Sequence, residues 1–186
     1  MTKENVTLDF PNLQAFDSYI EALKEGYRIG IQPQTNSEQI AEISTNPAAH
    51  LQALNEQKSG VITTPDGSQF PFVPYEFLWL TQGKEFIGSL SFRLELSELL
   101  KQFGGHIGFG IRPKYQRQGF GKLALRLAKD RAASIHGINR LLLTCSPDNP
   151  GSEKIIISNG GIYENTTKDT FGYLGEHKRF WIETRA

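Results

Sequence analysis

The chain has 186 residues, of which 38% are hydrophobic and 22% charged, a composition typical of one soluble globular domain. Lys and Arg together number 20, as do Asp and Glu, and the resulting zero net charge argues against a general nucleic-acid-binding protein, which would carry a basic excess. Cys145 is the one cysteine, so no intrachain disulfide can form. There is no signal-like start and no membrane-spanning apolar run, so we expect a cytoplasmic protein without nucleic-acid or membrane partners.

The first 60 residues are predicted to be helical. Four apolar residues recur at helical spacing, namely Leu13, Phe16, Ile20 and Leu23. Gly26 stands where a C-terminal cap would be. A second helix is expected over 37–46, with Ser37 as its cap, and a short helical piece over 48–54.

A strand hairpin is predicted next. Residues 65–67 form a Pro-Asp-Gly turn, and the aromatic-rich stretch 75–80 is typical of a strand. Residues 82–84 form a second turn, and 85–93 is the returning strand. This segment therefore begins the sheet of the protein.

Strands and helices then alternate. The expected elements are a strand over 105–112, an amphipathic helix over 122–135, a buried strand over 141–145, a helix from Asn149-Pro150 to Gly160-Gly161, and a strand around 178–183. Helices that precede a hairpin and then alternate with strands predict an α/β or α+β fold with a mixed sheet.

The chemistry of the chain is concentrated where the strand over 105–112 turns into the helix over 122–135. The first N–H groups of a helix lack partners within it, and together with the helix dipole they form an anion site. Gly119 and Gly121 let this backbone approach a ligand closely, and Lys114, Arg117 and Lys122 add positive charge. The loop is suited to a phosphate or pyrophosphate.

Two phosphate-binding motifs fit this loop poorly. A P-loop would require glycine at Gln116 and Ser or Thr at Leu123, so it is rejected. Residues 119–124 spell the dinucleotide pattern G-x-G-x-x-A, but that pattern places its first glycine directly after a strand. It also requires an acidic residue at the end of the next strand, where residues 144–146 are Thr-Cys-Ser.

A third motif fits better. Residues 116–121, Gln-Arg-Gln-Gly-Phe-Gly, resemble the Q/R-x-x-G-x-G/A signature of the GNAT superfamily of N-acetyltransferases, which binds the pyrophosphate of acetyl-CoA. Residues 107–113 look like the splayed strand of that family. Residues 149–152 are similar to its N-x-x-A/S segment, and 158–161 to the end of the helix that follows. The resemblance covers about residues 75–164.

The resemblance implies the fold and the partners. Residues 104–108 and 159–161 are similar to a subgroup of predicted bacterial acetyltransferases. The implied fold is the GNAT-like acyl-CoA N-acyltransferase fold, a twisted mixed sheet with helices on both faces. Its sheet is split at the CoA site, between the strands over 105–112 and 141–145. We expect a single domain over 1–186, in which residues 1–60 contribute to the site for an amine substrate, and an edge strand near the C-terminus that could form a homodimer.

The resemblance also implies direct transfer from acetyl-CoA to an amine of a small molecule or peptide, with no metal. The thioester oxygen would be held by backbone N–H groups near Phe109, Gly110 and Ile111. The pyrophosphate would be held at Arg117, Gln118, Gly119, Phe120, Gly121 and Lys122. Asn149 and Ser152 would lie on the pantetheine side.

The sequence departs from the family at the catalytic acid. The usual tyrosine position holds Ile156, so Tyr163, Tyr173 or a water is left to protonate the thiolate. His106 and Glu95 are the candidate bases, and the ordinary pKa of histidine, about 6.5, suits that role. The alternative to a catalytic role is that His106 is a hydrogen-bonded, half-buried histidine and that Glu95 is a solvent-facing strand residue.

Other interpretations stay open. The missing tyrosine favours a catalytically silent acyl-CoA-binding sensor as the alternative, and a nucleotide-dependent oxidoreductase is a weaker one. Asn149 is predicted to cap a helix, Arg112 to form salt bridges and Cys145 to be inert core. The aromatic stripe with Trp79 could line the acceptor site or belong to the core. No H-E-x-x-H spacing is present, which argues against a metal site.

Overall fold

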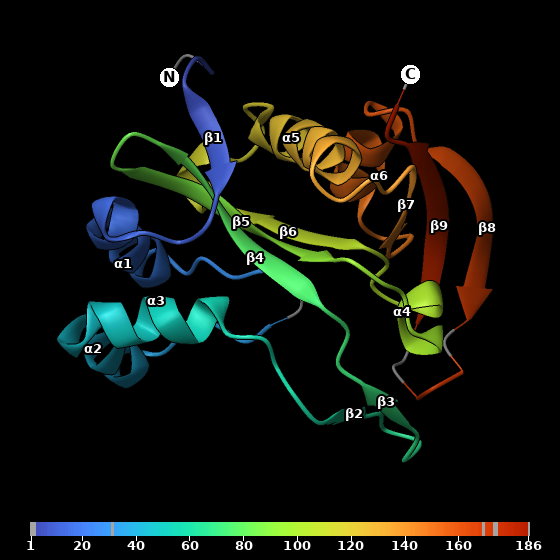
Figure 1. Cartoon of the computed structure of the whole chain (residues 1–186), viewed down its shortest axis with the longest axis horizontal. Coiled ribbons are helices and arrows are strands. Elements are labelled where there is room, and N and C mark those ends of the chain that lie inside the picture. Colours follow the sequence, from blue (N-terminus) through green and yellow to red (C-terminus); the bar gives the residue numbers. More distant parts are fainter. Residues whose placement is uncertain (1–2, 31, 169, 173–174, 186) are drawn as a thin grey trace. The chain divides into compact units, whose positions relative to one another are not determined.

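The computed structural model of the chain describes residues 3–30, 32–168, 170–172 and 175–185 (Figure 1). The chain forms two compact units. The first is made of residues 1–56, 76–91 and 108–124, and the second of residues 57–75, 92–107 and 125–186.

The first unit contains most of a four-stranded sheet with the order β1-β4-β5-β6. Its strands are β1 (Val6–Asp9), β4 (Tyr75–Gln82), β5 (Glu85–Arg93) and β6 (Ile107–Ile111). β1 runs antiparallel to β4, with Val6 opposite Gln82. The predicted hairpin is confirmed, but the all-helical prediction for residues 1–60 is wrong at β1. Four residues are too few to show a strand period, and β1 exists because β4 offers it a hydrogen-bonding edge.

Three helices follow β1. A short 3₁₀ turn (Leu13–Ala15) leads into α1 (Phe16–Lys24), and α2 (Ser37–Thr45) and α3 (Pro47–Asn55) complete the set. The predicted cap of α2, Ser37, is wrong, because Asn36 is the cap and Ser37 is the first helical residue. The Asn36 side chain accepts a hydrogen bond from the Gln39 amide, while the Gln39 side chain accepts one from the Asn36 amide, forming a capping box.

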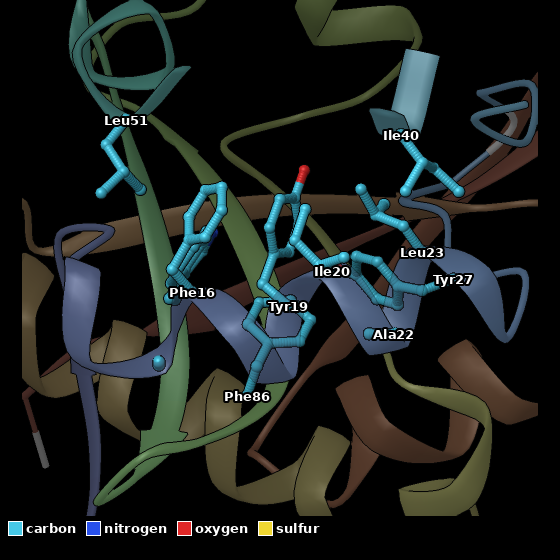
Figure 2. Packing of buried hydrophobic residues seen from close by; sticks show 11 residues of the cluster. Phe16, Tyr19, Ile20, Ala22, Leu23, Tyr27, Ile40, Leu51 and Phe86 are labelled. Carbon is cyan, nitrogen blue, oxygen red and sulfur yellow. The ribbon is translucent and has the colours of Figure 1, made fainter. Parts of the chain in front are cut away.

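These helices bury their apolar faces against β4 and β5 (Figure 2). The core cluster consists of Ala15, Phe16, Tyr19, Ile20, Ala22, Leu23, Tyr27, Ile40, Leu51, Trp79 and Phe86. The Tyr19 ring lies 4.7 Å from that of Trp79 and 5.2 Å from that of Phe86, centroid to centroid. Trp79 is fully buried, so this part of the aromatic stripe belongs to the core.

The second unit contains a three-stranded antiparallel sheet with the order β7-β9-β8. Its strands and helices are β2 (Val61–Thr63), β3 (Gln69–Pro71), α4 (Glu98–Gln102), β7 (Arg140–Cys145), α6 (Pro150–Ile157), β8 (Ile162–Lys168) and β9 (Glu176–Glu183). The 3₁₀ turn η2 (Pro113–Tyr115) belongs to the first unit, and α5 (Phe120–Ser134) begins there and ends in the second. β7 and β9 confirm two predicted strands, and α6 ends at Ile157, before the predicted Gly160-Gly161.

Candidate functional site

The start of α5 has the geometry of an anion site. The first intrahelical hydrogen bond runs from the Leu123 amide to the Gly119 carbonyl, 3.1 Å away. The N–H groups of Phe120 and Gly121 come before this bond and have no acceptor one turn earlier in the helix. The first turn of α5 contains no acidic residue, whereas α1, α2, α4 and α6 each carry one there. An anionic ligand at this helix start would meet the positive end of the helix dipole and no repelling carboxylate of the first turn.

The loop before α5 is shaped by two left-handed residues and held by two glutamines. Arg117 has φ 58° and Gly119 has φ 83°, so both residues adopt the left-handed conformation just before the helix. The Gln116 side chain donates to the Ile111 carbonyl at 2.9 Å, and the Gln118 side chain donates to the Lys114 carbonyl at 2.7 Å. These bonds fasten the loop to β6 and to η2.

One cation beside this loop was missed from the sequence. A Cβ atom added to Gly119 would stand 2.5 Å from the Nζ of Lys3, so the Lys3 ammonium lies directly against the loop. Lys3 stands before β1 and matches no motif, and only the folded chain brings it here. Together with Arg117 it adds positive charge at the start of α5.

In the part of the chain that the structure describes, β6 is the last strand of its sheet, and backbone groups lie along its outer, free edge. The Arg112 amide donates to the Ile87 carbonyl, and the Arg93 amide donates to the His106 carbonyl, both at 2.8 Å. Backbone groups alternate along a strand, so those of Gly110 also face β5, whereas those of Phe109 and Ile111 face away from it. The bond from Gln116 to the Ile111 carbonyl agrees with this parity.

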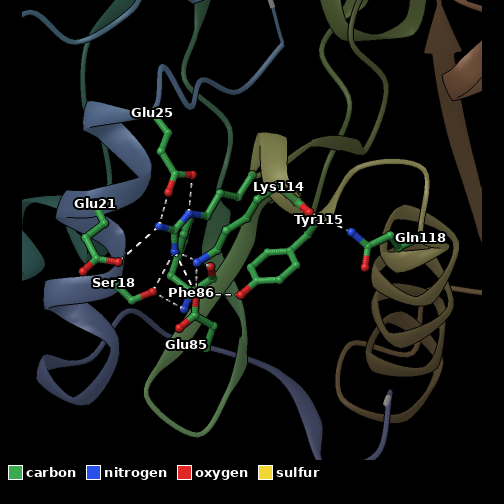
Figure 3. Close-up of polar contacts among 9 residues, drawn as sticks. Ser18, Glu21, Glu25, Glu85, Phe86, Lys114, Tyr115 and Gln118 are labelled. Atoms are coloured by element: carbon green, nitrogen blue, oxygen red, sulfur yellow. Dashed lines mark hydrogen bonds and ion pairs between the residues drawn. The ribbon is translucent and has the colours of Figure 1, made fainter. Parts of the chain in front are cut away.

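A buried arginine, Arg112, directly follows β6 and bonds to Ser18 and Glu21 of α1, which Figure 3 labels. The Arg112 side chain is 0% exposed. Its Nε and Nη2 donate to the two carboxylate oxygens of Glu25 at 2.8 and 2.6 Å, and Nη1 donates to Ser18 Oγ at 2.8 Å and to Glu85 at 2.9 Å. Nη2 also reaches Glu21 at 3.3 Å. The predicted salt-bridge role of Arg112 is confirmed.

The carboxylates of this cluster are held in their charged form. The hydrogen bond from Arg112 lowers the pKa of Glu25. Burial opposes ionisation of Glu85, but hydrogen bonds from Lys114 and Tyr115, each 2.7 Å long, outweigh it and lower the pKa of that carboxyl. Glu85 thereby anchors η2, the turn that leads into the loop before α5.

The candidate base His106 is buried and already hydrogen-bonded. Its backbone N–H donates to the Leu142 carbonyl, and its Nδ1 accepts from the Leu142 amide, both at 2.8 Å. Burial, with a smaller effect of the Arg93 charge, lowers the pKa of His106 to about 4. The neutral ring therefore carries its proton on Nε2, an arrangement suited to a structural histidine.

Glu95, the other candidate base, is exposed and lies two residues beyond the end of β5, so its predicted place on the strand is wrong. Ile156 is buried. Tyr163 is exposed on β8, its hydroxyl 2.8 Å from that of Thr166, and Tyr173 lies outside the described residues. Among the candidates that the structure describes, no hydrogen bond joins an acid to a base.

Asn149 is confirmed as a helix cap. Its side chain accepts a hydrogen bond from the Ser152 amide at 3.0 Å, at the start of α6.

Cys145 is buried at the end of β7, and burial raises the pKa of its thiol. Within the described ranges, no three His, Cys, Asp or Glu side chains are grouped to hold a metal ion. No helix in the described part of the chain has the length and apolarity needed to cross a membrane.

Comparison with solved structures identifies the fold as that of N-acetyltransferases. RimL, a ribosomal L7/L12 alpha-N-protein acetyltransferase in complex with coenzyme A, matches with a TM-score of 0.60 and 15% identity over 98% of this chain and 96% of its own. A variant of the spermidine N-acetyltransferase SpeG from Vibrio cholerae matches with a TM-score of 0.60 and 14% identity over 98% and 95%. The microcin C7 self-immunity acetyltransferase MccE, in complex with acetyl-CoA and AMP, matches with a TM-score of 0.60 and 13% identity over 97% and 93%.

The family follows from the sequence match. The acetyltransferase (GNAT) domain family matches residues 9–162, most of the chain, and the chain belongs to this family. A search of curated protein sequences gave no match. The family resemblance expected from residues 116–121 is confirmed, and so is the GNAT-like fold class.

Proposed function

We propose that the protein is an N-acetyltransferase that moves the acetyl group of acetyl-CoA directly to an amine of a small molecule or peptide. The observation that carries this proposal is the start of α5, where the Phe120 and Gly121 amides lie in a first turn without acidic side chains, beside the Lys3 and Arg117 cations. This donor set suits the doubly charged pyrophosphate of a coenzyme. RimL and MccE were solved with coenzyme A and acetyl-CoA, which supports the same ligand here.

Bound acetyl-CoA would supply an activated acyl group as its thioester. The Phe120 to Lys122 amides, with Arg117, Gln118 and Gly119, would hold the pyrophosphate. The free edge of β6 would pair with the pantetheine arm through Phe109 and Ile111, and a backbone N–H there would stabilise the thioester oxygen. The two candidates on α6, Asn149 and Ser152, stay predicted contacts for the pantetheine.

The reaction needs two proton movements. The amine nitrogen bonds to the carbonyl carbon while the carbon–sulfur bond breaks and its electron pair leaves on the sulfur. The amine gives a proton to a base, and the thiolate takes one from an acid or a water. RimL is named as an acetyltransferase of a ribosomal protein and SpeG as one of spermidine, which supports an amine as the acceptor of this chain. The cytoplasmic location, the single domain and the homodimer remain predictions.

The test is release of free thiol from acetyl-CoA when the protein is offered a panel of polyamines, amino-terminal peptides and small primary amines. We expect at least one amine to accelerate release in proportion to enzyme. Acetyl-CoA that binds while no amine, peptide or protein accelerates thiol release would instead establish the sensor, which the buried Ile156 at the usual acid position favours. Displacement of coenzyme A by NAD(P) would favour the dinucleotide interpretation.

The two candidate bases can be separated by mutation. The Nδ1 of His106 is occupied by the Leu142 amide, whereas Glu95 is exposed, so we expect Glu95→Gln to carry the larger loss of kcat. A loss above about tenfold with unchanged affinity for coenzyme A would identify the base. Glu98→Gln, three residues further on and paired with Lys101 on the surface, is the matched control. Unchanged kcat in Glu95→Gln and His106→Ala alike would remove both residues as bases and leave a water.

A further inference from the structure

Tyr27 places a buried hydroxyl against the backbone of β6. Its ring is packed edge-on against Phe86, with centroids 5.1 Å apart. The Tyr27 hydroxyl lies 2.6 Å from Ser89 Oγ and donates to the Gly110 carbonyl at 3.3 Å. A tyrosine hydroxyl has one hydrogen, so when that hydrogen bonds to the Gly110 oxygen, Ser89 is the donor between the two hydroxyls. The result is a chain of donors from Ser89 through Tyr27 to the Gly110 oxygen.

The segment that carries Tyr27 is held closely to this strand. A Cβ atom added to Gly110 would stand 2.7 Å from the Arg28 carbonyl oxygen and 3.2 Å from the Ile29 Cα. Glycine therefore permits the approach of residues 27–29 to β6. Burial raises the pKa of Tyr27 far above neutrality, so its hydroxyl stays protonated and remains a donor.

The bond to Gly110 orients the next amide. In a trans peptide the C=O and the following N–H point in opposite directions. The described chain contains no cis peptide bond. A Gly110 carbonyl held by Tyr27 on the β5 side therefore directs the Ile111 N–H toward the free edge of β6. A fixed donor stabilises developing negative charge better than one that must reorient.

We propose that Tyr27 is a positioning residue for acetyl transfer: by holding the Gly110 carbonyl, it fixes the Gly110–Ile111 peptide so that the Ile111 N–H polarises the thioester carbonyl. This inference rests on the proposed function, because it needs acetyl-CoA along β6. Tyr27 itself touches neither the substrate nor the reacting atoms and acts through the peptide.

The test reads the thioester carbonyl directly and needs no identified amine. [1-¹³C]Acetyl-CoA is bound to the protein, and the infrared stretch of the labelled carbonyl is compared with that of the free ligand. We expect a shift to lower frequency on the wild-type protein and a clearly smaller shift on Tyr27→Phe, while the Kd for coenzyme A changes less than about twofold. Where an amine substrate is known, kcat should fall about five- to tenfold with KM for acetyl-CoA unchanged.

Two further variants separate positioning from general packing. Tyr19→Phe removes a hydroxyl from another buried tyrosine of the same core, which contacts His50 rather than β6, and should leave the carbonyl stretch unchanged. Ser89→Ala should reproduce part of the Tyr27→Phe effect, and the double variant should match Tyr27→Phe alone, because Ser89 acts through Tyr27.

The outcomes distinguish this inference from the proposed function. If wild-type protein shifts the carbonyl stretch and Tyr27→Phe shifts it equally, the positioning role is wrong while the proposed function stands. Wild-type protein that does not bind acetyl-CoA contradicts the proposed function and this inference together. A loss of infrared shift in Tyr19→Phe as large as in Tyr27→Phe would assign the effect to core packing and overturn the inference.

Discussion

Replacing Gly121 by glutamate should weaken the binding of coenzyme A by at least about 100-fold. Two like charges 4 Å apart near a protein surface repel by about 4 kcal/mol, and each 1.4 kcal/mol is a factor of about ten in affinity. Gly121 is the second residue of α5, in the first turn of the helix, so the new carboxylate would stand at the proposed anion site. Isothermal titration calorimetry with coenzyme A measures the loss.

The matched control introduces the same charge at the same helical position elsewhere. Ala48 is the exposed second residue of α3, and Ala48→Glu should leave affinity for coenzyme A unchanged. Because Gly121 is buried, its replacement could also disturb packing. Lys3→Glu changes an exposed side chain against the same loop, and we expect it to weaken the affinity for coenzyme A by about tenfold. Native affinity in both Gly121→Glu and Lys3→Glu would show that the coenzyme binds away from this loop.

Replacing Arg112 by methionine should lower the free energy of unfolding by about 3 kcal/mol. Removing one partner of a buried ion pair costs about 3–5 kcal/mol, and the lower end applies because Glu25 and Glu85 are partly exposed and regain water. For a domain of this size we expect a fall in Tm of about 6–12 °C. Thermal or urea unfolding followed by circular dichroism measures it.

The same variant should flatten the dependence of stability on pH. Glu25 and Glu85 have a folded-state pKa below the unfolded value, so they contribute stability above the unfolded pKa, about 4.3, and this stability is lost as pH falls through the folded values. The wild-type protein should therefore lose stability between about pH 5 and 3 more steeply than Arg112→Met.

A surface arginine gives the control for this prediction. Arg140 pairs with Glu183 at 3.2 Å, but their side chains are 54% and 62% exposed. Arg140→Met should cost less than about 1 kcal/mol and leave the pH profile unchanged. Equal losses in Arg112→Met and Arg140→Met would mean that the buried cluster contributes no more than a surface pair.

Elements with a strong local pattern were predictable. Residues within one short segment are enough to predict each of four features: α5, β7, the β4–β5 hairpin and the cap at Asn149. β1 and β8 were missed because their residues are half or fully exposed and show no clear apolar alternation. Such strands form where a neighbouring strand offers unpaired backbone groups, which no local pattern records.

The amino-acid sequence alone indicated the family, because the glycines and glutamines of its motif and the start of the helix all lie within residues 116–122. The tertiary structure alone decided what surrounds that loop. It placed Lys3 against Gly119, Tyr27 against Gly110, and the Arg112 side chain among carboxylates from α1 and β5. It also placed the Leu142 amide in hydrogen-bonding contact with Nδ1 of His106. These contacts join segments distant in sequence, and burial and partner geometry, which set their chemistry, exist only once the chain has folded.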